Sequence, residues 1–180
     1  TGLQAFSIKP DIDGFDRRNY PGIKEESFDL LPMIQQAQAI KSKQSDSDMR
    51  IIASPWTAPP WMKDIEDWYR PGTEANNYQG TGGSLKPRYQ ATFADYLVKY
   101  LDAYRKQGVD IWGMTPVNEP LGNSGQWESM HFTAQSQNEF IKHHLGPKLH
   151  QSGYSDLKLL ILDHARNHLE QWAEVIYSDP

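Results

Sequence analysis

A glutamate stands beside an asparagine at a point where the backbone has little freedom. Asn118 and Glu119 lie between Pro116 and Pro120, and a proline fixes its own φ angle. A carboxyl group placed just past the end of a strand can be partly shielded from water, and such shielding raises a pKa and favours proton donation. The adjacent amide can hydrogen-bond a sugar hydroxyl. The same tripeptide is also an ordinary polar turn, because Asn and Pro are common turn residues.

Aromatic side chains gather in the segment from Pro55 to Tyr78. Flat aromatic faces stack on sugar rings and also on nucleobases. Between Pro55 and Lys86, however, three basic residues stand against four acidic ones, which argues against a nucleic-acid channel. The rings can instead pack a long loop onto the fold. We favour this interpretation for Trp61, Trp68 and Tyr69.

Asp163 and Arg166 form a charged pair at the end of a later aliphatic stretch. A charge in such a place is often held by its neighbour, so we expect a supporting role for the pair. His164 and His168 have the i, i+4 spacing of a zinc-binding helix. Ala165, however, occupies the place of a metalloprotease glutamate, and no third ligand is apparent. We therefore predict no metal site.

The composition argues against several classes of protein. The 180 residues carry 23 acidic and 18 basic side chains, a formal charge of -5 that leaves no surplus of cations for a nucleic-acid backbone. No apolar run approaches the ~18 residues of a membrane span. Mean hydropathy is -0.72, so we predict no integral membrane segment. The absence of cysteine excludes disulfides and thiolate chemistry. No leader-like segment follows Thr1, and the compartment stays open.

Hydrophobic periodicity predicts helices and strands in alternation. The clearest signal is an apolar stripe at helical spacing from Phe93 to Tyr104, which predicts a helix that Gly108 ends. Residues 1–23 show no period and are interpreted as a long loop. A helix is predicted from Phe28, with Asp29 as N-cap and an apolar face that includes Met33 and Ile40. Another is predicted from Thr133 to Leu149, with an interruption at Gly146 and Pro147, and an amphipathic one over 167–177 with Leu169 on its apolar face. Strands are predicted over 50–54, 109–115 and 157–162, the last buried on both faces.

This alternation requires parallel strands with right-handed crossovers, which leaves a doubly wound sheet or a (β/α)8 barrel. No glycine-rich phosphate turn follows any strand, whereas the loops after the first two strands are long and rich in Trp, Asn and Glu. We therefore predict an α/β fold of the TIM-barrel type, with Trp56 pointing into the barrel mouth. Three strands are fewer than eight, and a complete barrel takes ~250 residues. We expect residues 1–180 to be a fragment of a single barrel domain.

Three segments together resemble glycoside hydrolase family 30, the glucosylceramidase-like glycosidases. They are ASPWTAPPWMK at 53–63, TPVNEP at 115–120 and LILDHAR at 160–166, and their order and separation both match the family. The resemblance covers nearly the whole chain from Phe28 onward. It implies a (β/α)8 barrel with an attached β-domain and hydrolysis of β-glycosidic bonds with retention of configuration.

Carried over by motif, the resemblance makes Glu119 the general acid/base and Asn118 the partner of the sugar 2-hydroxyl. It makes Trp56 a wall of the sugar pocket and Trp127 a residue of the leaving-group side. Asp163 and Arg166 match the end of the fifth barrel strand, so the strands here would be the third to fifth. The family's nucleophile is a glutamate on the seventh strand. No residue of this chain matches it, and the N-terminal strands and the β-domain have no counterpart here either.

The resemblance implies a retaining β-glycosidase, foremost a glucosylceramidase-type β-glucosidase, that needs no metal and no organic cofactor. Its partner would be a β-glucoside, either a glycolipid or an oligosaccharide. A β-1,6-glucanase or β-xylosidase of the same family is the alternative. From another class, the rival is a non-catalytic sugar-binding protein on a degenerate barrel. Family members are expected to be secreted, periplasmic or lysosomal. The chain as given would catalyse nothing by itself, because it carries one of two required carboxylates.

Overall fold

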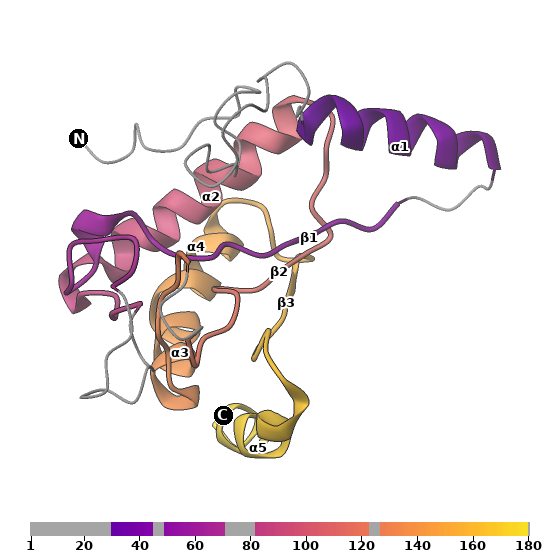
Figure 1. The fold of residues 1–180 in the computed structure, drawn as a ribbon. Helices are drawn as coiled ribbons and strands as arrows, with labels where there is room; N and C mark the ends of the chain where they lie inside the picture. Colours follow the sequence, from indigo (N-terminus) through magenta and orange to yellow (C-terminus); the bar gives the residue numbers. More distant parts are fainter. Residues whose placement is uncertain (1–29, 45–48, 71–81, 123–126, 180) are drawn as a thin grey trace.

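A computed structural model describes residues 30–44, 49–70, 82–122 and 127–179 (Figure 1). Its centre is a sheet of three parallel strands in the order β1-β2-β3, which is also their order along the chain. The strands are short: β1 is Ile52–Ala53, β2 is Gly113–Met114 and β3 is Lys158–Leu159. Adjacent parallel strands in chain order, with helices between them, form part of a (β/α)8 barrel, as the sequence predicts.

Five α-helices accompany the sheet within the described residues (Figure 1). They are α1 (Leu30–Gln44), α2 (Gln90–Lys106), α3 (Ala134–Phe140), α4 (Gly146–Gln151) and α5 (Leu169–Tyr177). The α-β-α-β-α-β-α order predicted from periodicity is confirmed, with a π-helical turn inside the third helix, between α3 and α4. The predicted N-cap at Asp29 and the predicted loop over 1–23 lie outside the described residues.

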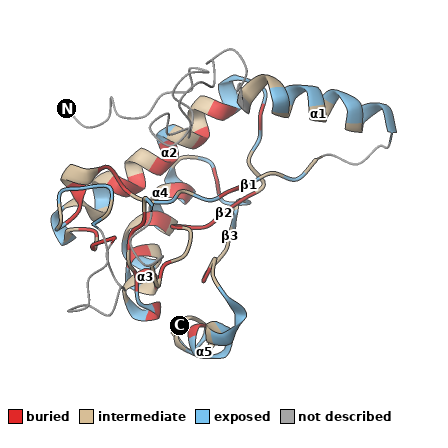
Figure 2. Cartoon of the chain, in the orientation of Figure 1, coloured by how far each residue is buried: buried red, intermediate tan, exposed pale blue. Residues whose placement is uncertain are grey.

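Helix α2 buries more apolar side chains than any other helix of the described residues (Figure 2). The predicted stripe is its buried face, and Phe93 stacks on Phe140 of α3 with ring centroids 5.6 Å apart. The helix ends before Gly108, whose φ of +75° is a conformation that glycine adopts without steric cost. The side chains of α2 that are almost fully buried are Phe93, Ala94, Leu97, Val98, Leu101 and Tyr104.

Two predictions of burial are wrong for the described residues. In α1, Met33 and Ile40 belong to the expected apolar face, yet they are 60% and 57% exposed. The strand predicted over 157–162 shortens to β3 at the edge of the sheet, where Lys158 is exposed and Leu159 half-buried. Both elements lie at the periphery of the described structure, where no described element covers their outer side (Figure 1).

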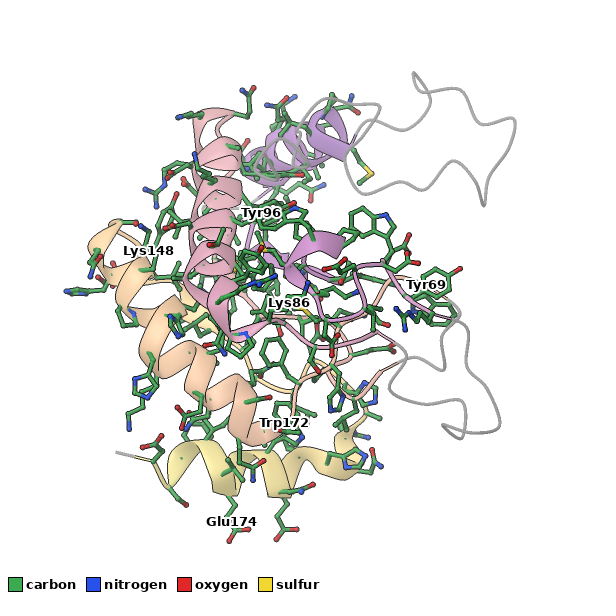
Figure 3. The ribbon with its side chains drawn as sticks, turned by 90° about the vertical axis from the view of Figure 1, so that its left-hand side faces the viewer. Tyr69, Lys86, Tyr96, Lys148, Trp172 and Glu174 are labelled. Carbon is green, nitrogen blue, oxygen red and sulfur yellow. The ribbon has the colours of Figure 1, made fainter. Side chains whose placement is uncertain are left out.

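The last helix is oriented by one large side chain. Trp172 of α5 is 2% exposed and points toward the rest of the molecule, whereas Glu174 points to solvent (Figure 3). The end of this helix is tied to α3 because Asp179 accepts hydrogen bonds from Asn138 and Lys142. Leu169, expected on the buried face, is half exposed at the start of the helix.

The predicted interruption at Gly146 and Pro147 is wrong, since the backbone stays helical from Ala134 to Gln151. A π-helical turn over Ile141–Leu145 joins α3 to α4, and the Gly146 N–H donates to the carbonyl of Ile141. The wider turn accommodates Pro147, which has no N–H and would clash with a carbonyl in a regular helix. The predicted start is confirmed, because Thr133 and Ser136 form a capping box.

Gly146 is required by this π turn, because a Cβ there would lie 2.9 Å from the Ile141 carbonyl oxygen. Glycine to alanine inside a helix ordinarily stabilises by about 1 kcal/mol. For Gly146→Ala we predict the opposite: the free energy of unfolding should fall by about 1–3 kcal/mol, because the added Cβ is packed too closely against the backbone. Thermal unfolding of the complete protein measures it, with exposed Gln151→Ala as the control. A raised melting temperature would contradict the prediction.

Candidate active site

The segments that follow the three strands meet at one edge of the sheet. The N–H of Thr115, directly after β2, donates to the carbonyl of Ala53 at 3.1 Å. The N–H of Asn118 donates to Pro55 at 2.7 Å, and that of Glu119 donates to the carbonyl of Asp163 at 2.8 Å. Backbone hydrogen bonding therefore continues past the strands. It brings the segments that carry Trp56, Asn118, Glu119 and Asp163 together.

Glu119 has an unusual backbone conformation. Its φ angle is +45°, in the left-handed region that residues other than glycine seldom adopt. Two hydrogen bonds hold it there, because its N–H donates to Asp163 and its carbonyl accepts from Gly122 at 2.8 Å. Asn118 and Glu119 are half-buried between fully buried Val117 and Pro120. The Glu119 carboxyl thus stands at a strained, well-held position, partly shielded from water.

Two tryptophans from different loops lie against each other near this edge. Trp56 follows β1 and Trp127 follows β2, and their ring centroids are 6.3 Å apart at an angle of 56°. The rings are 47% and 36% exposed, so each presents a face to solvent. The sequence singles out both residues, and the structure brings them into one aromatic pair.

The other aromatic residues of the loop after β1 behave differently from one another. Trp61 is half-buried and packs edge-on against Tyr89 at 5.0 Å, as expected of a ring that anchors the loop. Tyr69 is half-buried as well. Trp68 is 37% exposed, so its ring is only partly packed against the fold. Its backbone carbonyl accepts a hydrogen bond from the Lys63 ammonium.

Asp163 and Arg166, for which the sequence predicts a supporting role, do not contact each other as an ion pair among the residues that the structure describes. Arg166 is exposed at the start of a 3₁₀ turn. The Asp163 carboxylate instead accepts a hydrogen bond from the hydroxyl of Ser54. Ser54 follows β1 and Asp163 follows β3, so this bond spans the sheet edge. Sequence spacing does not reveal it, since 109 positions separate the two residues.

Lys63 is a further residue that sequence reasoning missed. Its side chain is fully buried, and its ammonium donates to the carbonyls of Trp68 at 2.7 Å and Ser129 at 2.8 Å. Burial lowers the pKa of Lys63 to about 8, against the opposing effect of the nearby carboxylates of Asp64, Asp67 and Glu128. The available signal was a lysine directly after the apolar residues of the 53–63 motif.

Comparison with known proteins identifies the family. The sequence profile of the Glycosyl hydrolase family 30 TIM-barrel domain matches residues 3–180. The chain belongs to glycosyl hydrolase family 30. It is 37% identical over 185 residues to the lysosomal acid glucosylceramidase of Mus musculus, a match that covers 99% of this chain and 33% of that protein.

Two other relatives are named as β-1,6-glucanases. The chain is 36% identical over 116 residues to an endo-1,6-beta-D-glucanase of Neurospora crassa, covering 64% of this chain and 22% of that protein. The solved endo-beta1,6-glucanase BT3312 superposes with a TM-score of 0.70 at 30% identity, covering 94% of this chain and 36% of that one. The crystal structure of SrfJ from Salmonella typhimurium superposes with a TM-score of 0.71 at 25% identity, and the match covers 97% of this chain and 36% of SrfJ. This family 30 chain spans about a third or less of the length of the curated relatives it matches.

In the part of the family 30 chain that the structure describes, no three His, Asp or Glu side chains cluster in a way that could hold a metal ion. His164 and His168 have ring centroids 6.5 Å apart. No helix within the described ranges combines the length and apolar character needed to cross a bilayer.

The lowered pKa of Lys63 predicts a pH dependence of stability. The unfolded lysine has a pKa of 10.5 and the folded one about 8, so between these values the unfolded state binds more protons. The contribution of Lys63 to the free energy of unfolding therefore rises as pH increases from about 8 to 10.5.

Denaturation midpoints of the complete protein and of its Lys63→Met variant, taken across this window, measure the effect. We expect the denaturation midpoint of the wild type, relative to that of the variant, to increase as pH rises. Parallel pH curves for the two proteins would show that the pKa of Lys63 is not lowered.

Proposed function

We propose that the protein containing this chain is a retaining β-glycoside hydrolase in which Glu119 is the general acid/base. The placement of Glu119 carries the proposal. Its carboxyl is half-buried just past β2, and its backbone is held in a left-handed conformation by hydrogen bonds. Strand ends of this kind are where TIM-barrel enzymes place their catalytic groups. Membership of family 30 agrees with this reaction class.

In this mechanism Glu119 acts twice. As a carboxylic acid it donates its proton to the glycosidic oxygen while the bond from that oxygen to the anomeric carbon breaks. A second carboxylate attacks the anomeric carbon from the opposite face and forms a glycosyl ester. Glu119, now ionised, then takes a proton from a water molecule whose oxygen attacks the anomeric carbon and displaces the second carboxylate. Two inversions leave the configuration retained.

The second carboxylate lies outside this chain in our proposal. The family resemblance assigns the nucleophile to a glutamate on the seventh barrel strand, and no residue here matches it. We therefore propose that the chain is an internal part of one catalytic barrel domain, covering about its third to fifth strands. The partial coverage of full-length relatives supports this. No metal or organic cofactor is needed, because two carboxyl groups carry every proton and bond change.

The neighbouring residues receive roles from their positions. Asn118, next to Glu119, would hydrogen-bond the sugar 2-hydroxyl. Trp56 would form a wall of the sugar pocket, and Trp127, in contact with it, the leaving-group side. Asp163 would support the site through its carbonyl bond to Glu119. Arg166, exposed and further along the chain, is the member of the set with least support from its contacts.

For the substrate we propose a β-glucoside, and foremost a glucosylceramide-type glycolipid. The support is the match to mouse lysosomal acid glucosylceramidase, which covers almost the whole chain. A β-1,6-glucan is the second candidate, supported by the Neurospora crassa relative and by BT3312. A β-xylosidase has weaker support, because the xylanase structures that match are 19–21% identical and show the fold alone. A lysosomal, secreted or periplasmic location follows only from the resemblance.

Replacing the proposed acid/base gives the most direct test of its role. In the complete enzyme, we expect Glu119→Gln to reduce turnover of a β-glucoside with a poor leaving group by roughly 10²–10⁴-fold. With an activated aryl β-glucoside, the rate of the glycosylation step should fall far less, because that leaving group needs little protonation. Steady-state kinetics on the two substrates measure the difference. Equal losses on both, or none, would count against Glu119 as the acid/base.

Side-by-side assays separate the substrate candidates. We expect the complete protein to show a higher kcat/KM for glucosylceramide than for a β-1,6-glucan. The reverse order would favour the glucanase. Saturable binding of either sugar with no hydrolysis of any β-glycoside would instead identify the non-catalytic sugar-binding alternative.

A further inference from the structure

Lys63 is a buried charged group that the proposed reaction does not use. A lysine ammonium is seldom fully buried, because its removal from water costs free energy that only good partners offset. The two carbonyls that it contacts belong to different loops. Trp68 lies in the segment after β1, and Ser129 lies in the segment after β2. The ammonium therefore joins two loops that the strands themselves do not hold together.

The joint also includes a third segment. Met62 and Asp64, on either side of Lys63, exchange backbone hydrogen bonds with Lys86 and Ser84. The carbonyl of Gly83 in turn accepts from His131 at 2.7 Å. Two isolated β-bridges, Lys63 with Leu85 and Ser84 with His131, thus link residues 62–64, 83–86 and 129–131, and the Lys63 ammonium adds its contact with Ser129. We call this the loop joint.

The loop joint is connected to the candidate active site at both of its ends. Trp127 stands two residues before Ser129, and the N–H of Phe132 donates to the carbonyl of Pro120, directly after Glu119. On the other side, residues 57–62 lead back from Lys63 to Trp56. The aromatic pair of Trp56 and Trp127 therefore has one member on each loop that the ammonium joins.

We propose that Lys63 is a positioning residue that fixes the segment carrying Trp127 against the loop carrying Trp56, and thereby shapes the leaving-group side of the site. The interpretation in terms of the leaving group rests on the proposed function. The existence of the loop joint does not, since it is defined by hydrogen bonds alone.

A lysine suits this position because of both its charge and its length. Its ammonium satisfies two backbone carbonyls at once, and the carboxylates of Asp64, Asp67 and Glu128 favour the charged form. A methionine is of similar length but has no donor, so it would remove the ammonium from both buried carbonyls. The Trp68 carbonyl would keep only the long hydrogen bond from the N–H of Ser129, at 3.4 Å. We therefore expect the segment 127–132 to be held less firmly against the loop after β1.

Lys86 provides a matched control. It belongs to the neighbouring segment of the loop joint and is labelled in Figure 3. Its ammonium, however, contacts the largely exposed carboxylate of Glu66, not a buried carbonyl. The Lys86 side chain is 17% exposed and that of Glu66 is 69% exposed, and an ion pair with one partner in water contributes little. Lys86→Met therefore removes the same charge and the same donors without opening the joint.

The test uses the complete enzyme with two β-glucosides, glucosylceramide as the large leaving group and a small activated aryl glucoside. We expect Lys63→Met to raise KM for glucosylceramide about tenfold and to leave KM for the aryl glucoside within about twofold, as when one charge-assisted contact is lost. Lys86→Met should change neither. Loss of kcat on both substrates with both KM values unchanged would show that Lys63 only stabilises the fold, and would overturn the proposal.

A second variant reaches the same joint without touching the lysine. A Cβ on Gly82 would lie 2.5–2.7 Å from the hydroxyl, carbonyl carbon and carbonyl oxygen of Ser129. Gly82→Ala must therefore displace the carbonyl that Lys63 contacts. We expect it to reproduce the selective rise in KM. If Lys63→Met does not fold, the Gly82→Ala result decides: equal effects on the two substrates would overturn the proposal.

Hydrogen exchange separates failure of this inference from failure of the proposed function. We expect Lys63→Met to speed exchange of backbone amides in 62–68 and 129–132, and Lys86→Met not to. If exchange in Lys63→Met is unchanged, Lys63 does not hold the loop joint together, and the inference is overturned regardless of the activity of the variant. A wild type that hydrolyses no β-glucoside but shows the expected exchange pattern would reject the proposed function while retaining the joint.

Discussion

The candidate site depends on one backbone hydrogen bond, from the N–H of Glu119 to the carbonyl of Asp163. The strands pair over only two residues each, so their register alone leaves the following segments free to diverge. This bond and the one from Asn118 to Pro55 extend the pairing beyond the sheet. With the bond from Gly122 to the Glu119 carbonyl, the Asp163 bond also holds Glu119 in a left-handed conformation, which costs on the order of 1–3 kcal/mol. The carboxyl is placed by its backbone, before any contact of its side chain is considered.

Local signals in the sequence predicted the elements well. The stripe from Phe93 to Tyr104 is the buried face of α2, because an apolar repeat of that length has one way to avoid water. Thr133 begins its helix because its side chain satisfies an otherwise unpaired N–H. The position of Asn118 and Glu119 past β2 followed from the same reasoning. Each of these features depends on residues close together in the sequence.

The features that were missed depend on distant residues. Lys63 and Ser129 are 66 positions apart, and Ser54 and Asp163 are 109 apart. No periodicity reports such contacts, since they arise only when the barrel brings strand ends together. The π turn was missed for a different reason. Gly146 and Pro147 ordinarily end a helix, and only the wider turn before them, with its bond to Ile141, lets the helix continue.

The burial of Lys63 has a consequence for the order of folding. Its two carbonyl partners, Trp68 and Ser129, lie on opposite sides of α2 and β2 in the sequence. The ammonium gives up its water only when both carbonyls are in place, because a half-formed site would leave the charge desolvated and poorly paired. We therefore expect α2 and β2 to form first and the loops to close together afterwards. The walls of the site would then be the last part of this structure to assemble and the first to open when it is destabilised.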